Sequence, residues 1–131
     1  MEDKICLDTD ILVNFLRNEE KAVSFIEENE TSKELAITYI NAFELYYGAY
    51  KSNKQEQNLD AAFRLLSRLT LLNLNDDSVR EAAKILVKLE KHGSIIDFRD
   101  ILIGSMALVN KYSIKTNNVK HFNRIEGLQI L

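Results

Sequence analysis

The chain has 131 residues, 46% of them hydrophobic and 28% charged, and its 17 Lys and Arg against 20 Asp and Glu give a formal net charge of −3. This length and apolar fraction predict one domain spanning residues 1–131 and exclude a disordered chain. The acidic balance argues against a protein that holds nucleic acid by a large basic surface. The longest apolar stretch, Ile101–Val109, is well short of the roughly 20 residues that a membrane-spanning helix needs.

The N-terminus and the cysteine content bear on the compartment. Met1–Lys4 has no basic segment leading into an apolar one, so we expect no secretory signal. Cys6 is the single cysteine, which excludes an internal disulfide and a Cys-rich zinc site. We therefore expect a soluble, cytoplasmic domain that does not contact a membrane.

Short apolar runs typical of buried strands alternate with segments of helical periodicity. The predicted strands are Ile5–Leu7, Leu35–Thr38, Leu71–Leu74, Ser113–Thr116 and Leu128–Leu131. The predicted helices lie in Ile11–Arg17, Lys21–Asn29, Leu59–Leu69, Val79–Leu86 and Ile101–Val109. Strands separated by helices favour right-handed crossovers. We therefore predict an α/β fold, a three-layer α/β/α sandwich around a central, mostly parallel sheet of about five strands.

The spacing of apolar residues predicts the buried faces of the later helices. One face is formed by Leu59, Ala62, Phe63, Leu66 and Leu69, and the next helix has a face formed by Val79, Ala82, Ala83 and Leu86. Ser78-x-x-Glu81 is typical of a capping box that starts this helix, and Gly93 is typical of its C-terminal cap. Ile101–Val109 is apolar nearly all round, which predicts a helix packed on both sides.

Three polar residues, Asp8, Thr9 and Asp10, directly follow the first predicted strand. Asp and Thr are favoured helix N-caps, so capping is one explanation. A cap needs only one side-chain oxygen, however, whereas three polar side chains crowd this strand end. Ligands of doubly wound sheets bind outside the carboxyl ends of the strands, so these residues are also candidates for a functional site.

Further carboxylates are predicted at the same edge of the sheet. Glu44 falls on the apolar stripe of a helix after the second strand, where a carboxylate is costly unless it is paired, hydrogen-bonded or bound to a metal; surface exposure is the alternative. Asp97 and Asp100 stand at the entry to the most apolar helix, where helix capping or pairing with Arg99 also explains them.

The fourth predicted strand ends in Thr116–Asn118, for which a simple turn is the default explanation. This turn, Asp8, Glu44 and Asp100 are all predicted at one sheet edge. Neighbouring carboxylates raise each other's pKa, a penalty that a divalent cation removes, and Mg²⁺ and Mn²⁺ prefer carboxylate oxygen. The two histidines lack the spacing of a zinc site. Such a site suits phosphodiester hydrolysis.

Four motifs are spread in order over nearly the whole chain. They are Leu7-Asp8-Thr9-Asp10-Ile11-Leu12, Asn41-x-x-Glu44-Leu45-x-x-Gly48, Asp100-Ile101-Leu102-Ile103-Gly104 and Thr116-Asn117-Asn118-x-x-x-Phe122-x-x-Ile125-x-Gly127-Leu128. With these motifs the chain resembles the PIN-domain ribonucleases, and within them the VapC-type toxins of bacterial and archaeal toxin–antitoxin pairs. Each motif alone is weak, but four in order at suitable separations are a strong signal.

The resemblance implies a metal-dependent endoribonuclease that hydrolyses RNA by attack of a water on the phosphate. It implies that Asp8, Glu44 and Asp100 form an acidic triad for Mg²⁺ or Mn²⁺, with Glu44 binding directly, through water, or as the acceptor of the water's proton. Thr9 is implied to support the site. The resemblance also implies a homodimer that a small cognate antitoxin neutralises.

The chain departs from the family pattern at a few positions. Asn118 stands where many relatives carry a fourth acid, so a tightly held second metal is in doubt, and we expect Asn118 and Thr116 to orient water or substrate. Asp10 replaces the commoner asparagine and Gly104 the commoner alanine. Asp97 is an additional nearby carboxylate, for which capping is the simpler explanation.

Two further groups of side chains are candidates for contacts with RNA or a partner. Lys115, Lys120 and Arg124 lie in a C-terminal segment without acids, and we hypothesise that they line one flank of the RNA path. Three aromatic side chains are candidates either for a partner surface or for the core: Tyr46, Tyr47 and Tyr50.

Two alternatives stay open on sequence alone. Asp8-Thr9-Asp10 also resembles the Asp-x-Asp opening of haloacid-dehalogenase-like phosphatases, in which the first Asp is the nucleophile, but that interpretation leaves Glu44 unexplained and places Leu12 where that family prefers Thr or Val. The other alternative is a catalytically degenerate PIN-fold binding module. Loss of a fourth acid favours it, and retention of the other three argues against it.

Overall fold

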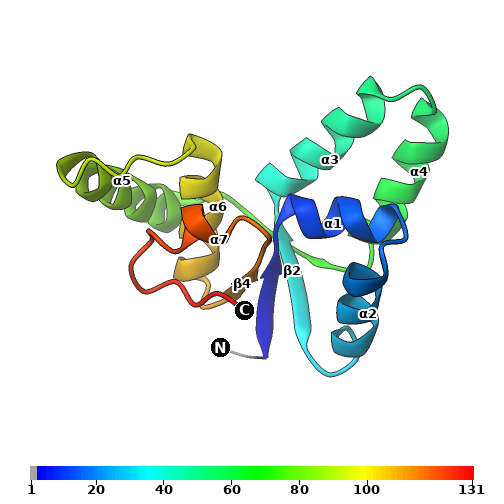
Figure 1. The fold of residues 1–131 in the computed structure, drawn as a ribbon, viewed down its shortest axis with the longest axis horizontal. Coiled ribbons are helices and arrows are strands. Elements are labelled where there is room, and N and C mark those ends of the chain that lie inside the picture. Colours follow the sequence, from blue (N-terminus) through cyan, green and yellow to red (C-terminus); the bar gives the residue numbers. More distant parts are fainter. Residues whose placement is uncertain (1–2) are drawn as a thin grey trace.

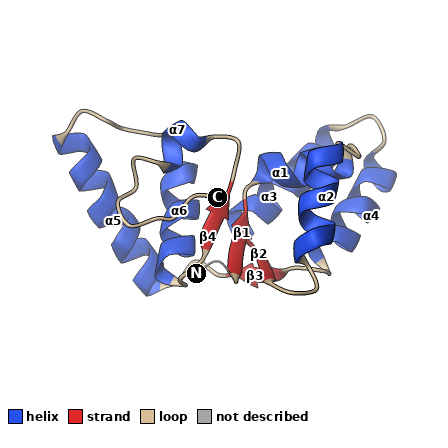
Figure 2. Ribbon diagram, turned by 60° about the horizontal axis from the view of Figure 1, so that its bottom comes forward, coloured by secondary structure: helices blue, strands red, loops and turns tan. Residues whose placement is uncertain are grey.

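A four-stranded, all-parallel sheet forms the centre of the computed structural model, which describes residues 3–131 (Figures 1 and 2). The strands are β1 (Lys4–Leu7), β2 (Glu34–Thr38), β3 (Thr70–Leu72) and β4 (Ser113–Lys115), in the order β3-β2-β1-β4. In the central register, Cys6 is paired with Ala36 on one side and with Ile114 on the other. The strands are nearly continuously apolar because parallel sheets are covered on both faces.

Helices cover both faces of the sheet, as the sandwich prediction requires. They are α1 (Thr9–Leu16), α2 (Glu20–Asn29), α3 (Tyr39–Lys51), α4 (Gln55–Leu66), α5 (Asp76–Lys91), α6 (Phe98–Val109) and α7 (Val119–Phe122). Helices α1–α4 lie on one side of the sheet and α5–α7 on the other (Figure 1). Among these described residues, no helix is both long enough and apolar enough to cross a membrane.

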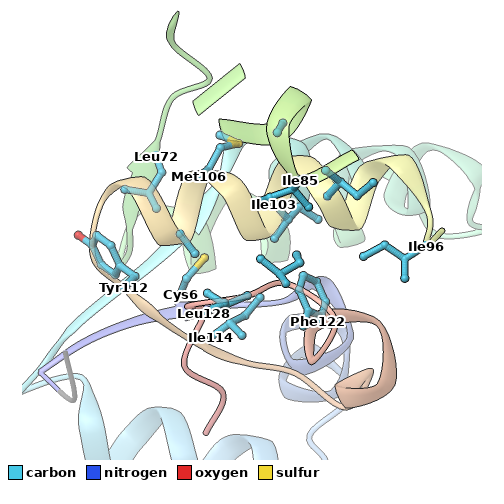
Figure 3. Close-up of a cluster of buried hydrophobic side chains, with 14 of the residues drawn as sticks. Cys6, Leu72, Ile85, Ile96, Ile103, Met106, Tyr112, Ile114, Phe122 and Leu128 are labelled. Carbon is cyan, nitrogen blue, oxygen red and sulfur yellow. The ribbon is translucent and has the colours of Figure 1, made fainter. Parts of the chain in front are cut away.

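Alternating side chains of β1 divide the core into two clusters. Ile5 and Leu7 pack into the cluster under α1–α4, whereas Cys6 packs into the cluster under α5–α7. Met106 and Ile103 of α6 lie in the second cluster near Cys6 and Leu72 (Figure 3). Helix α6 is buried along most of its length, which confirms the prediction for the most apolar segment.

The prediction of a fifth strand at Leu128–Leu131 is wrong. In the segment 128–131 the structure has only an isolated parallel bridge between Ile130 and Ile114, after a turn at Gly127 with φ +88°. The Ile114 N–H donates to the carbonyl of Gln129, and the N–H of Leu131 donates to the Ile114 carbonyl. The apolar signal that predicted a strand comes partly from Leu128, whose side chain packs into the core under α6.

The predicted capping box of α5 lies one turn too late. Asn75 is the N-cap, its Oδ1 accepting from the Ser78 N–H at 3.0 Å, while the Asn75 N–H donates to Ser78 Oγ at 2.8 Å. Consequently Val79 is exposed, and the buried face consists of Ser78, Ala82, Ile85 and Leu89. The predicted helix end is correct, because Gly93, with φ +64°, directly follows the C-cap.

The apolar face predicted for the helix in Leu59–Leu69 is also partly wrong. Helix α4 ends at Leu66, so Leu69 lies beyond it, and Phe63 is 63% exposed. Ala62, Leu65 and Leu66 are the buried residues of α4. Apolar spacing by itself did not decide which of several overlapping faces turns toward the sheet.

Candidate active site

The candidate site residues lie on loops and first helical turns at the carboxyl edge of the sheet. There β1 runs into α1, β2 into α3, and β4 into residues 116–118 before α7 (Figure 1). The first turn of α6 reaches the same edge, because Asp100 accepts a hydrogen bond from the Asn118 side chain at 3.2 Å. The fold therefore brings the four sequence motifs together.

Asp8 is the most deeply buried carboxylate at this edge and is 7% exposed. As the N-cap of α1, its Oδ1 accepts from the Thr9 backbone N–H at 2.8 Å and from Asn41 Nδ2 at 3.3 Å. Its Oδ2 accepts from the Thr116 hydroxyl at 2.7 Å. Capping is thus correct for Asp8, but it accounts for only one of three hydrogen bonds.

The pKa of Asp8 is raised from 3.8 to about 6, mainly because the carboxylate is buried. The charges of Asp10 and Asp100 contribute to this rise, while the hydrogen bonds from Thr116 and Thr9 lower the pKa and oppose it. The neutral donors therefore do not offset the cost of burying this charge.

Asn41 links the β1 and β2 ends, and sequence analysis assigned it no role. It is fully buried, and its Oδ1 accepts from the Thr38 N–H at 3.0 Å and the Thr38 hydroxyl at 2.7 Å. Its Nδ2 donates to Thr9 Oγ1 at 2.9 Å and to Asp8. Thr38 is typical of an N-cap at a strand-to-helix junction, and with Asn41 it forms the capping box that starts α3. No local pattern predicts the hydrogen bonds from Asn41 Nδ2 to Asp8 and Thr9.

Glu44 faces the site from α3. Its Oε1 accepts from the Thr9 hydroxyl at 2.6 Å, and its Oε2 lies 3.2 Å from Arg99 Nη1. The side chain is 22% exposed. Glu44 is therefore hydrogen-bonded and ion-paired but also partly exposed, and its neighbours on the predicted stripe, Phe43 and Tyr47, are 62% and 57% exposed. The predicted apolar stripe is thus not a buried face.

Asp100 faces the site from the first turn of α6, and its side chain is 16% exposed. Its Oδ2 accepts from Asn118 Nδ2 and lies 2.7 Å from His121 Nδ1. Asn118 Nδ2 also lies 2.9 Å from His121 Nδ1, so the three side chains form one polar cluster. No local pattern in the sequence signals this contact, because the two residues lie 21 positions apart; His121 was a candidate only for a zinc site, which its spacing from His92 excludes.

One continuous chain of hydrogen bonds joins the three carboxylates. From Glu44 to Asp100 it passes through Thr9, Asn41, Asp8, Thr116 and Asn118. The step from Thr116 to Asn118 is made by the Asn118 backbone N–H, which donates to Thr116 Oγ1 at 2.9 Å. Residues from four segments of the chain are held in one network at one edge.

Asp10 and Asp97 serve as anchors beside this network. Asp10 Oδ2 accepts from the Asn117 N–H at 2.9 Å and so ties the β4 loop to α1, while its Oδ1 is buried without a hydrogen-bond partner in the described part of the chain. Asp97 is the N-cap of α6, and the backbone and side-chain N–H groups of Arg99 lower its pKa. Capping is therefore the correct interpretation of Asp97.

The donor set at this edge suits a hard divalent cation. Asp8, Glu44 and Asp100 supply carboxylate oxygens, and Asn118 supplies an amide, whereas no cysteine ligand is within reach because Cys6 points into the core. Across residues 3–131, no three His, Cys, Asp or Glu side chains converge closely enough to hold a metal ion by themselves. The carboxylates are instead occupied by the neutral donors and by Arg99 and His121.

The basic residues near the C-terminus have separate contacts. Lys115 Nζ lies 5.0 Å from the ring centre of Phe25, whereas Arg124 Nη1 donates to the carbonyls of Ser94 and Ile95 at 3.5 and 3.3 Å. A shared role of Lys115, Lys120 and Arg124 in RNA binding stays a prediction.

The three tyrosines that were candidates for the core or for a partner surface differ in exposure. Tyr46 is partly buried against the α1–α4 cluster, whereas Tyr47 and Tyr50 are 57% and 59% exposed. Tyr47 stacks on Phe43 of the same helix, with ring centres 6.2 Å apart.

Comparison with known proteins identifies the family. Residues 5–128 match the family model of the PIN domain. The chain is 33% identical to ribonuclease VapC2 of Rickettsia felis over 93% of this chain and 92% of that protein, and 30% identical to the tRNA(fMet)-specific endonuclease VapC of Shigella flexneri over 96% and 95%. Its fold matches a chain in the crystal structure of VapBC2 from Rickettsia felis bound to a promoter DNA fragment, with a TM-score of 0.90, 31% identity, and 97% and 96% coverage. The chain therefore belongs to the PIN-domain family, and within it to the VapC ribonucleases.

Proposed function

We propose that this chain is the toxin of a type II toxin–antitoxin pair and cleaves RNA internally at the edge formed by Asp8, Glu44 and Asp100, with Mg²⁺ or Mn²⁺ as cofactor. The observation that carries the proposal is the unbroken hydrogen-bond chain that joins these three carboxylates. The same observation favours an enzyme over a degenerate binding module, because a module has no need to keep the three acids in one network.

Asp8 and Asp100 are the principal metal ligands in this proposal, and Glu44 binds directly or through water, or accepts the proton of the attacking water. Mg²⁺ commonly keeps several waters and needs only one or two protein carboxylates, so a site without three converging acids is compatible with it. When bound, such an ion lowers the pKa of a water and offsets charge on the leaving oxygen.

The neutral residues of the network position the reacting groups. Thr116 and Asn41 hold both oxygens of Asp8, and Thr9 holds Glu44, so that each carboxylate presents a fixed orientation. Asn118 orients water or substrate through its side-chain amide. The helix N-termini at this edge add backbone N–H donors for phosphate oxygens.

The partners follow from the relatives. The matching Rickettsia felis structure is of a VapBC2 complex, which supports a small cognate antitoxin for this chain. A homodimer is part of the same proposal, and light scattering of the purified chain tests it as a mass twice that of the monomer. The proposed place of action is the cytoplasm, where the RNA substrate and the antitoxin are made.

The test is cleavage of end-labelled initiator tRNA, chosen because the Shigella flexneri relative is named as tRNA(fMet)-specific, beside an unrelated structured RNA. We expect cleavage with Mn²⁺, none with EDTA, and a loss of about 100-fold or more in Asp8→Asn. Asp60→Asn is the matched control, since Asp60 is exposed on α4 and pairs with Arg64. Cleavage that survives both EDTA and Asp8→Asn would reject the proposed mechanism.

A further inference from the structure

Arg99 places a positive charge inside the acidic edge. It lies in the first turn of α6, between the N-cap Asp97 and the candidate ligand Asp100. Its Nη1 is 3.2 Å from Glu44 Oε2 and its Nη2 is 3.4 Å from Asp97 Oδ2. Lys115 and Arg124 have contacts with other groups, whereas Arg99 contacts a carboxylate of the site directly.

A role as counter-ion alone does not account for this placement. The Arg99 side chain is 55% exposed, and ion pairs at that exposure contribute little to stability. A guanidinium has five N–H donors, and the pairs with Glu44 and Asp97 leave donors directed to solvent. The exposed part of the group is therefore available to a ligand.

We propose that Arg99 binds a phosphate group of the RNA substrate beside the scissile bond. This inference rests on the proposed ribonuclease function and adds a substrate-binding residue to it. The planar fork of arginine matches two oxygens of a phosphate as it matches two oxygens of a carboxylate. The Glu44 oxygen, 3.2 Å from Nη1, marks a position where Arg99 already pairs with an anionic oxygen at this edge.

The local structure orients Arg99 for this role. Asp97 accepts from both the backbone N–H of Arg99 at 2.9 Å and its side chain, so the residue is fixed at its base and at one arm. The other arm reaches across to α3, next to the carboxylates. In a chain with a net charge of −3, a local cation at the acidic site favours the approach of a polyanion.

The experiment measures binding of labelled initiator tRNA, in the non-cleaving Asp8→Asn background with Mg²⁺, as a function of salt. We expect Arg99→Gln to weaken binding about tenfold and to reduce the slope of log affinity against log salt by about one, as loss of one phosphate contact does. Arg99→Lys keeps the charge without the fork, so we expect it to keep the slope and recover part of the affinity. Arg64→Gln, which removes an exposed arginine paired with Asp60 on α4, is the matched control and leaves both unchanged.

Two further measurements separate binding from a counter-ion role. Urea unfolding and Mn²⁺ titration without RNA report how Arg99→Gln affects the fold and the acidic edge. If Arg99→Gln kept the affinity and salt slope of the parent while changing only stability or Mn²⁺ affinity, Arg99 would be a counter-ion of Glu44 and the proposal would be overturned. If instead the unmodified chain failed to cleave RNA with Mn²⁺, the proposed function would fall, whereas the salt slope would still decide whether Arg99 contacts phosphate.

Discussion

The two halves of the acidic edge are built differently. In the buried half, Asp8 and Asn41 are enclosed by the protein, and every hydrogen-bond donor to Asp8 is neutral. In the open half, Asp100 of α6 and Glu44 of α3 are partly exposed and contact His121 and Arg99. The buried half fixes geometry at a cost in desolvation, and the open half keeps its charged groups near solvent.

This difference indicates a division of labour. Burial raises the pKa of Asp8 to about 6, and the neutral hydrogen bonds to its oxygens only partly oppose this rise. Ion pairs near solvent are weak and break at little cost, so Arg99 can exchange the Glu44 carboxylate for the phosphate proposed above. We expect substitutions in the buried half to change stability strongly and those in the open half to change it little.

The largest effect is expected for Asn41→Ala. The substitution removes the acceptor of the buried Thr38 N–H and hydroxyl together with the amide donor to Asp8, and each buried polar group left unpaired costs about 1–3 kcal/mol. We expect a loss of about 2–4 kcal/mol in the free energy of unfolding, measured in urea with EDTA present. Asn110→Ala, which removes a single bond to the Met106 carbonyl, is the control and costs about 1 kcal/mol or less. Equal losses in the two variants would contradict the linking role of Asn41.

Asp8→Asn is expected to stabilise the metal-free protein by about 1–3 kcal/mol at pH 7.5. Because the pKa of Asp8 is 3.8 when unperturbed and about 6 when folded, the folded state binds more protons than the unfolded state between these values. The Asp8 contribution to stability therefore falls as pH rises from about 4 to 6, and the advantage of the variant grows over the same window. Urea unfolding of the parent and the variant at pH 4 and pH 7.5 measures this difference in the free energy of unfolding. A variant less stable than the parent at pH 7.5 would show that burial does not penalise this carboxylate.

A smaller effect is expected in the open half. His121→Ala removes the Nδ1 contact to Asp100 from a side chain that is 38% exposed, and we expect it to change the free energy of unfolding by less than about 1 kcal/mol. His121→Asn, which keeps a donor near the Nδ1 position, is the matched variant. A loss as large as that of Asn41→Ala would erase the distinction between the two halves.

The smallest effect is expected for chemical labelling of Cys6. The accessibility of its thiol reports whether the end of β1 beside Asp8 opens. Its thiol is fully buried, and burial together with the charge of Asp8 raises its pKa, so little thiolate forms at neutral pH. We expect no measurable labelling by iodoacetamide in the native protein at pH 8 over minutes and full labelling in urea. Rapid labelling of the native chain would indicate that the β1 end opens readily.

The sequence by itself determined the alternation of the first four strands with helices, the parallel sheet and the location of Asp8, Glu44, Asp100 and Asn118 at one edge, but not the short helix α7. These features follow from local patterns, because the spacing of apolar residues distinguishes a strand from a helix. The carboxyl ends of parallel strands then lie at the same edge of the sheet. Apolar period failed where the competing signal was a specific side chain, as with the Asn75 cap that starts α5 one turn early.

Only the tertiary structure decided which side chains contact one another at that edge. Thr116 and Asp8 are 108 residues apart, and Thr9 and Glu44 are 35 apart, so neither hydrogen bond leaves a local trace in the sequence. The same holds for Asn41 as the link between two strand ends and for Arg99 reaching from α6 to Glu44. Long-range contacts depend on how the helices pack on the sheet. The spacing of residues predicts which face of a helix is buried, but not which side chain of another element it contacts.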